Sequence, residues 1–185
     1  GTETLTTSGV GSTFNDKDVA DATTVTINSS TLVDGTNGGL ASNYSLATGQ
    51  TVAAAITAKA LTATAVAANK VYDGNATATS TLTLSGLIGT ETLTTSGVGS
   101  TFNDKDVLDA NTVTVTASTL VDDTNGNGLA SNYSLATGQT ASANITAKAL
   151  TAAASAAVKV YDGNTTATST LALSGLIGTE TLTTS

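Results

Sequence analysis

The sequence predicts an all-β fold made of tandem antiparallel β-sandwich repeats of immunoglobulin-like build, each about 89 residues long. Three observations lead to this prediction. The string Lys-Val-Tyr-Asp-Gly-Asn occurs twice, and its tyrosines, Tyr72 and Tyr161, lie 89 residues apart. Threonine alternates with apolar residues along short segments, which is typical of strands with one buried face. Asn-Gly and Asp-Gly pairs lie between these segments and mark tight turns.

The recurrence covers almost the whole chain. Residues 1–22 return at 89–110 with one change, Ala20 becoming Leu108, and a third copy begins at Gly178. Solenoid units are about 20–50 residues long. A unit near 90 residues is longer than that, so we expect each to be a globular domain with its own core.

The domain boundaries follow from the recurrence. We place a complete repeat at residues 59–147, with the C-terminal part of a repeat at 1–58 and the N-terminal part of the next at 148–185. At 145–148 the sequence Ile-Thr-Ala-Lys carries one repeat into the next without Gly or Pro. We therefore expect a short and stiff joint.

Comparison of the copies predicts which side chains face inward. Between residues 51–56 and 140–145, every second position stays apolar while the positions between them change. Alanine likewise holds at every second position of 63–67 and 152–156. This period of two predicts strands and no helix, despite the helical propensity of alanine. The first set of apolar pairs is Val52/Ala141, Ala54/Ala143 and Ile56/Ile145.

Further strands are predicted by plain alternation. Residues 77–84 and 112–116 alternate threonine with apolar residues, and 90–95 and 132–135 are shorter candidates. The apolar side chains expected to face inward are Ala78, Leu82, Leu84, Val113 and Val115. The expected turns are Asp34-Gly35, Asn37-Gly38, Asp73-Gly74, Asn125-Gly126 and Asn127-Gly128.

The composition excludes several functions. The chain has no Cys and no His, so it lacks disulfides, thiolate metal sites, Ser-His-Asp catalysis and the commonest metal ligand. A net charge of −8 argues against binding to nucleic acid or an anionic membrane. No apolar run approaches the roughly 20 residues of a membrane span. We therefore predict that the chain is not an enzyme.

Calcium is the cofactor that the acidic segments allow. Asp104 and Asp106 lie in one such segment and Asp122 and Asp123 in another, and spaced carboxylates can bind Ca²⁺. No glutamate follows at the spacing of an EF-hand, so we favour solvated turns and predict no cofactor.

The tyrosines are the other candidate site. Exposed aromatic residues could bind a ligand, but with so few aromatics we favour core anchors whose hydroxyls reach the backbone. The residues of this predicted structural motif are Tyr72, Asp73, Gly74, Tyr161, Asp162, Gly163, Tyr44 and Tyr133.

Three motifs together resemble the YDG repeat domain. They are Lys-Val-Tyr-Asp-Gly-Asn, then Asn-Tyr-Ser-Leu at 132–135, then Ile-Thr-Ala-Lys at 145–148. That family and its MBG-type relatives occur in tandem in very large bacterial surface proteins, including filamentous-haemagglutinin-like adhesins. They often have proline where Ala147 stands. The resemblance implies an extracellular stalk or fibre module on a bacterial cell, and it supplies no catalytic residue.

We expect a structural module that assembles end to end into a filament. Its partners would be neighbouring copies of the same repeat, with a host or neighbouring-cell surface as a further candidate, and no nucleic acid. One alternative is an adhesive module that binds glycan or protein through loops such as 122–128. A second is a subunit that polymerises by strand exchange, in which half-repeats of two chains complete each other. We favour a window of a longer array over this second alternative.

Overall fold

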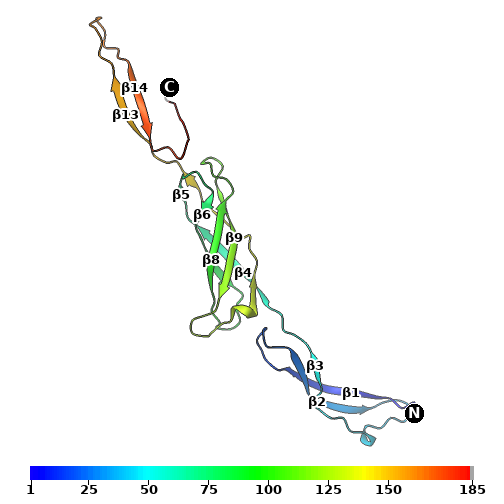
Figure 1. The fold of residues 1–185 in the computed structure, drawn as a ribbon. Coiled ribbons are helices and arrows are strands. Elements are labelled where there is room, and N and C mark those ends of the chain that lie inside the picture. Colours follow the sequence, from blue (N-terminus) through cyan, green and yellow to red (C-terminus); the bar gives the residue numbers. More distant parts are fainter. Residues whose placement is uncertain (184–185) are drawn as a thin grey trace. The chain divides into compact units, whose positions relative to one another are not determined.

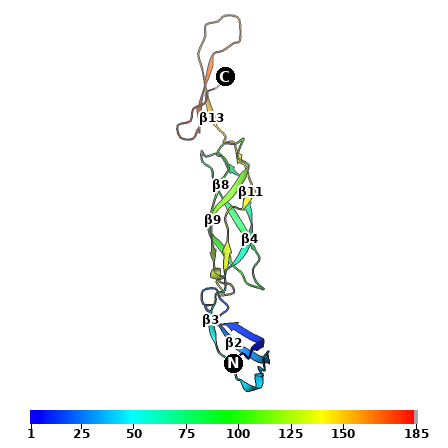
Figure 2. The ribbon, with the colours of Figure 1, turned by 90° about the vertical axis from the view of Figure 1, so that its right-hand side faces the viewer.

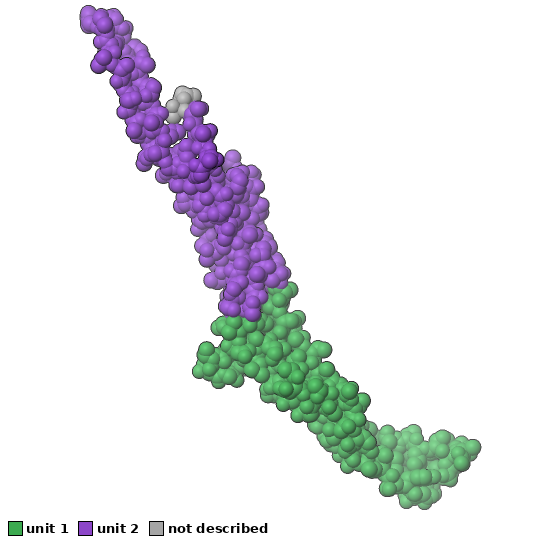
Figure 3. Space-filling model, in the orientation of Figure 1, with its two compact units in different colours: residues 1–62, 85–94, 120–136 green, residues 63–84, 95–119, 137–185 purple. Residues whose placement is uncertain are grey.

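The computed structural model describes residues 1–183, which form β-strands and two single-turn 3₁₀ helices but no α-helix. The all-β prediction is therefore confirmed. By their internal contacts the residues fall into two compact units, coloured green and purple in Figure 3. The border between the units runs through residues 59–147, so the domain boundaries proposed above stay a prediction. The green unit comprises residues 1–62, 85–94 and 120–136, and the purple unit comprises 63–84, 95–119 and 137 onward.

Most strands are short, as Figures 1 and 2 show. The elements in chain order are β1 (Leu5–Phe14), β2 (Thr24–Asp34), η1 (Ala41–Asn43), β3 (Thr51–Ala53), β4 (Lys59–Ala67), β5 (Lys70–Val71), β6 (Thr77–Ala78), β7 (Ser80–Ser85), β8 (Thr94–Phe102), β9 (Thr112–Val121), η2 (Ala130–Asn132), β10 (Tyr133–Leu135), β11 (Thr140–Ser142), β12 (Ile145–Thr146), β13 (Thr151–Ala156) and β14 (Ser169–Ser174).

Strand β1 and all but the first two residues of β8 were not predicted, because both strands contain Ser-Gly-Val-Gly-Ser and glycine weakens a strand pattern. The register of β1 against β2 shifts between Ser8 and Gly11, and Gly9 has a φ of 58°. Glycine adopts this left-handed conformation without steric cost, so the irregularity is a β-bulge that the sequence accommodates.

Several predicted bounds were wrong. Only the last two residues of 90–95 belong to a strand, and Asn132 ends η2 before β10 begins. The strand predicted at 51–56 is β3, which stops at Ala53, and its copy divides into β11 and β12. Strands were confirmed at 63–67, at 152–156, at 112–116 and, with a break at Thr79, at 77–84.

Most strand pairs are antiparallel, as the sequence predicts, but two pairs are parallel, which the sequence did not predict. β10 runs parallel to β4, with Tyr133 opposite Lys59, and β12 runs parallel to β5, with Ile145 opposite Lys70. Alternating side chains show which face of a strand is buried, but they do not show the direction of its partner. The remaining sheets contain β1-β2-β3, β11-β9-β8-β6 and β13-β14, while β4 lies between β10 and β7.

The core contains the side chains that the alternation predicted. Val113, Ala143 and Ile145 are buried in one cluster with Phe102 and Ala110. The positions between them on the last strands are exposed, which confirms the inward face predicted for 140–145. Tyr72 and three alanines, Ala67, Ala76 and Ala78, pack against this cluster while partly exposed. A small core of valine, isoleucine and alanine therefore needs two aromatic rings to complete it.

One asparagine holds the loop between β8 and β9. The side chain of Asn103 donates to the carbonyl oxygen of Asp109 at 2.9 Å and accepts from the backbone N–H groups of Asn111 and Thr112 at 3.0 and 2.9 Å. Asn15 makes the same three contacts in the other copy of the sequence. Asparagine commonly binds backbone groups in this way where a chain turns.

We expect Asn103→Ala to lower the free energy of unfolding by about 1–3 kcal/mol, because it removes three hydrogen bonds to the backbone. Urea unfolding measures the loss. Asn103→Asp is the matched control, since its carboxylate keeps both acceptor contacts and should lose less. Equal losses in the two variants would show that the acceptor contacts do not hold this loop.

Candidate functional site: a polar contact between the sequence copies

The candidate site joins the loop after β1 to η2 and β10, all within the green unit of Figure 3. The loop reads Asp16-Lys17-Asp18-Val19. An oxygen of Asp16 accepts from the backbone N–H of Asp18 at 2.8 Å, which is a turn that aspartate favours. This turn presents the Asp18 side chain and the Val19 backbone to residues that lie more than 110 positions later in the chain.

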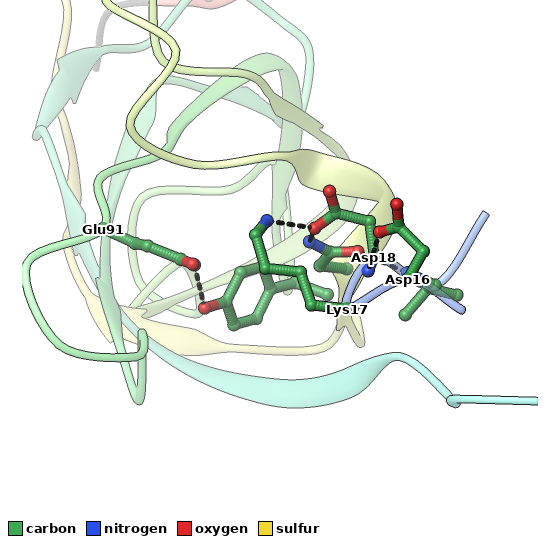
Figure 4. Close-up of polar contacts among 7 residues, drawn as sticks. Asp16, Lys17, Asp18 and Glu91 are labelled. Atoms are coloured by element: carbon green, nitrogen blue, oxygen red, sulfur yellow. Dashed lines mark hydrogen bonds and ion pairs between the residues drawn. The ribbon is translucent and has the colours of Figure 1, made fainter. Parts of the chain in front are cut away.

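Asn132 binds this loop through both the oxygen and the nitrogen of its side-chain amide. Its oxygen accepts from the backbone N–H of Val19 at 2.8 Å, and its nitrogen donates to Asp18 Oδ1 at 2.7 Å. Lys17 Nζ lies 2.7 Å from the same Asp18 oxygen (Figure 4). The contacts at Asp18 and Val19 are partly buried, where a satisfied hydrogen bond is costly to break.

Tyr133, the residue after Asn132, is the buried aromatic side chain that lines the site. Its side chain is 6% exposed, and its hydroxyl accepts from the backbone N–H of Ile88 at 3.0 Å and donates to Glu91. Figure 4 shows Glu91 at one end of the site and Asp16 and Asp18 at the other, with Lys17 between them. The tyrosine is thus fixed by both a backbone and a carboxylate partner. The hollow of about 350 Å³ here is lined by Lys17, Asp18, Val19, Ile56, Thr57, Lys59, Ile88, Glu91, Asn132 and Tyr133.

Hydrogen bonds shift the pKa values of two groups in the site. The contacts from Lys17 and then Asn132 hold the pKa of Asp18 below its ordinary value of 3.8. The bond to Glu91 raises the pKa of the Tyr133 hydroxyl above 10.0. Both shifts favour the protonation states that make the observed bonds near neutral pH.

A lowered pKa in the folded protein means that ionised Asp18 contributes stability above pH 3.8 and that this contribution is lost as the pH falls through the folded pKa. We expect acid to weaken the hydrogen bonds of Asn132 to Asp18 and Val19. The chemical shift of the Val19 amide proton reports this change in an NMR titration from pH 6 to 2. Asp18→Asn should remove the acid-dependent part of that shift. An identical titration in this variant would contradict the assignment.

Five of the residues that line this hollow recur in the purple unit. There a hollow of about 260 Å³ forms beside Tyr72, whose hydroxyl donates to Glu180, and this bond raises the pKa of Tyr72. The same residue types line both hollows at equivalent positions of the two sequence copies. The matching pairs are Asp18/Asp106, Val19/Val107, Lys59/Lys148, Ile88/Ile177 and Glu91/Glu180.

Sequence reasoning missed the glutamates. The chain has three, and each accepts a hydrogen bond from a tyrosine hydroxyl. The signal in the sequence is that a rare residue type returns once in each copy. The tyrosine hydroxyls were expected to reach the backbone, but within residues 1–183 those of Tyr44 and Tyr72 bind glutamates and that of Tyr133 binds both a glutamate and a backbone group. The pairs are Glu3/Tyr44, Glu91/Tyr133 and Glu180/Tyr72.

The other residues of the predicted structural motif lie in turns or on the surface. Tyr44 is 50% and Tyr161 is 93% exposed, whereas Tyr72 is half-buried. Lys70 Nζ lies 2.7 Å from Asp73 Oδ1, and Lys159 makes the same pair with Asp162 at 2.8 Å. Each lysine lowers the pKa of its aspartate. Gly74 and Gly163 follow with φ of 81° and 77°.

The four candidate calcium ligands bind nearby groups of the chain. Asp104 and Asp122 each accept from a backbone N–H, that of Asp106 at 2.8 Å and that of Ala130 at 2.7 Å. Asp106 pairs with Lys105, and Asp123 faces the backbone N–H of Asn127 at 3.4 Å. Among residues 1–183, no three acidic side chains gather in a way that could hold a metal ion.

We expect Tyr133→Phe to lower the free energy of unfolding by about 1–2 kcal/mol, because the Ile88 N–H loses its acceptor and Glu91 loses a donor. Thermal unfolding measures the effect. The matched control is Tyr44→Phe, where the half-exposed hydroxyl binds only Glu3 and should matter less. A larger effect at Tyr44 would show that burial does not set the strength of these bonds.

Comparison with known families agrees with the motifs. The sequence model of the YDG domain matches residues 57–142. A search of curated proteins found no match, and neither did a search of solved structures. No helix in the described part of the chain is long and apolar enough to cross a membrane.

Proposed function

We propose that the chain is a structural module of a bacterial extracellular fibre or adhesin stalk, in which β-sandwich repeats join end to end into a filament. The observation that carries the proposal is the contact of Asn132 with Asp18 and Val19, which ties one sequence copy to the next. A contact made of a turn, an amide and a tyrosine is suited to hold two neighbouring repeats together.

Recurrence supports the proposal. The loop residues of this contact return as Asp106 and Val107, beside a lysine, an isoleucine and a glutamate that also return. A filament needs the same joint at each step, because equal joints repeat the same angle. The match of the YDG domain model to residues 57–142 adds support. Domains of the YDG family occur in tandem in very large bacterial surface proteins.

The alternative of a binding module finds less support in the loop that suggested it. Asn127 in the 122–128 loop donates to the carbonyl oxygen of Thr90 at 2.6 Å, and its own carbonyl accepts from Thr92 at 2.9 Å. Polar groups used in this way within the chain are less available to a glycan or protein. An exposed adhesive loop would leave them turned to solvent.

A series of chains with one, two and four added copies of residues 59–147 tests the filament proposal. Small-angle X-ray scattering should show a maximum dimension that grows in proportion to the number of copies. Growth with the square root of that number would indicate flexible linkers and contradict a stiff fibre. Asp18→Ala with Asn132→Ala should reduce the stiffness, while Asp34→Ala, outside the contact, should not.

The proposed extracellular location of the protein needs a separate experiment. Antibodies against residues 59–147 should label intact bacterial cells that produce the native protein. Labelling that appears only after the cells are made permeable would overturn the extracellular part of the proposal and leave the filament part to the scattering series.

A further inference from the structure

Two short parallel strand pairs tie the beginning of residues 59–147 to the end. β4 and β5 come first in this part of the chain, whereas β10 and β12 come last. β5 pairs with β12 in the purple unit, and β4 pairs with β10 in the green unit. The segments around the first of these pairs, residues 69–72 and 144–146, are called the terminal clamp below. A pull from neighbouring repeats would reach the pairs through Ala58 and Ala147, which adjoin residues 59–147 or end them.

Hydrogen bonds join the two segments of the terminal clamp along their length. The backbone N–H of Lys70 donates to the carbonyl oxygen of Asn144 at 3.1 Å. The backbone N–H of Tyr72 donates to the carbonyl oxygen of Thr146 at 2.8 Å. Side chains add two further bonds. The oxygen of Asn69 accepts from the backbone N–H of Asn144 at 2.8 Å, and the Thr146 hydroxyl donates to the Lys70 carbonyl at 3.2 Å.

The side chain of Ile145 fixes the register of the terminal clamp. It stands opposite Lys70, is 2% exposed and belongs to the buried cluster with Phe102 and Val113. Successive side chains of a strand point to opposite faces, so a slip of β12 by one residue would bring Ile145 out of the core. The two strands therefore cannot slide past each other without breaking hydrogen bonds and exposing this side chain.

The parallel direction of β5 and β12 decides how tension loads the terminal clamp. The amino end of β5 leads back through β4 to Ala58, and the carboxyl end of β12 leads to Ala147. In a parallel pair these two ends point in opposite directions. Tension therefore draws the strands past each other and loads their hydrogen bonds together. In an antiparallel pair the two ends would lie side by side, and the bonds would break one at a time.

The pair of β4 with β10 has the same arrangement. Lys59 follows Ala58 directly and stands opposite Tyr133, and Leu61 stands opposite Leu135. Leu61 and Tyr133 are each 6% exposed, so buried side chains fix the register of this pair too. Tension on Ala58 would thus also meet a parallel pair that has to slide before it can separate.

We propose that residues 59–147 are a force-bearing unit in which the terminal clamp sets the resistance to unfolding under tension. The inference rests on the proposed fibre, because a stalk anchored at one end and attached at the other is pulled along its length. It adds a mechanical function to that proposal. Forced unfolding is governed by the unfolding rate, so contacts that break after the clamp contribute to stability without setting this resistance.

The other copy of the sequence supplies a variant that tests the terminal clamp. Val158 stands where this copy has Asn69, and valine has no hydrogen-bond acceptor in its side chain. Asn69→Val therefore removes one bond of the clamp while leaving the backbone bonds in place. A chain with this change should unfold faster under force than the native sequence.

Single-molecule force-clamp measurements on the whole chain test this, with Ala58→Cys and Ala147→Cys as handles. Both alanines are exposed, and the native chain has no cysteine. We expect Asn69→Val to unfold roughly 2- to 10-fold faster than the native sequence at the same force, which corresponds to the loss of one hydrogen bond. An unchanged rate overturns the proposal.

Asn103→Ala is the matched control, because it removes side-chain hydrogen bonds in the loop between β8 and β9, outside the terminal clamp. It should lower stability in urea yet leave the unfolding rate under force close to that of the native sequence. If Asn103→Ala accelerates forced unfolding as much as Asn69→Val, the clamp does not set the resistance and the proposal is overturned.

The direction of pulling provides a readout that no loss of stability imitates. Handles at Thr77→Cys and Ala147→Cys lie beyond the carboxyl ends of both β5 and β12, so tension peels the two strands apart from one end. The chain should unfold at clearly lower force between these handles than between Ala58→Cys and Ala147→Cys. Equal forces in the two directions overturn the proposal.

Failure of this inference is distinguishable from failure of the proposed fibre. The force measurements depend on bonds within residues 59–147, whereas the scattering series depends on the joints between copies. An unchanged rate for Asn69→Val together with a stiff scattering series would remove the force-bearing clamp alone. Flexible linkers in the scattering series together with a direction-dependent unfolding force would remove the stiff fibre and keep the clamp.

Discussion

Ile145→Ala is expected to lower the free energy of unfolding by about 2–5 kcal/mol, the largest effect of any single change considered. Ile145 is 2% exposed and belongs to the cluster with Phe102, Val113 and Ala143. Truncation removes three carbons from a core made mainly of small side chains. Alanine and valine neighbours cannot move into the space, so a cavity adds to the lost burial.

Urea unfolding, followed by intrinsic tyrosine fluorescence, measures this loss. The chain contains its own matched control, since Ile56 stands at the same position of the sequence and is only partly buried. Ile56→Ala should therefore cost clearly less. If the two variants lose the same stability, the cluster at Ile145 is not the core on which the stability of residues 59–147 depends.

Gly128→Ala is expected to be the second large change, lowering the free energy of unfolding by about 1–3 kcal/mol or more. A Cβ at this position would lie 2.3 Å from the carbonyl oxygen of Thr92. That distance is far inside van der Waals contact, and a backbone oxygen cannot rotate away. The loop at 122–128 would have to leave residues 90–92, breaking the contacts of Asn127 with Thr90 and Thr92.

The control for this change is Gly99→Ala, where a Cβ would meet its nearest neighbours at 3.4 and 3.5 Å, an ordinary contact. Gly99 lies in β8, where alanine costs less backbone entropy than glycine, so its stability should change little. Thermal unfolding compares the two. A loss at Gly128 no larger than that at Gly99 would show that the loop does not pack closely on residue 92.

The same close approach occurs in the other copy of the sequence. A Cβ on Gly39 would lie 2.1 Å from the carbonyl oxygen of Thr4. The turn before it is one residue shorter than its counterpart, yet the closing glycine meets the equivalent threonine, Thr4 in one copy and Thr92 in the other. The contact of glycine with backbone is therefore independent of the insertion that changes the repeat spacing.

The candidate site was only partly predictable. The sequence pointed to the tyrosines because they are rare and recur, and Tyr133 does lie at the centre of the site. It gave no reason to choose Asn132 or Glu91, which look like ordinary surface residues. Glu91 binds a partner more than 40 positions away, and Asn132 binds one more than 110 positions away. No local sequence pattern contains either contact.

Local periodicity by itself determined several of the strands and, as at Ala143 and Ile145, which of their faces is buried, because alternate side chains on an extended backbone point to opposite sides. Glycine and asparagine pairs determined turns, as at Asn37-Gly38, where both residues have positive φ. Tertiary structure alone decided that β10 runs parallel to β4, that the 122–128 loop packs on Thr92, and that Asn132 holds Asp18. These features depend on distant segments meeting, and the free energy of such contacts is set by the partner as much as by the residue itself.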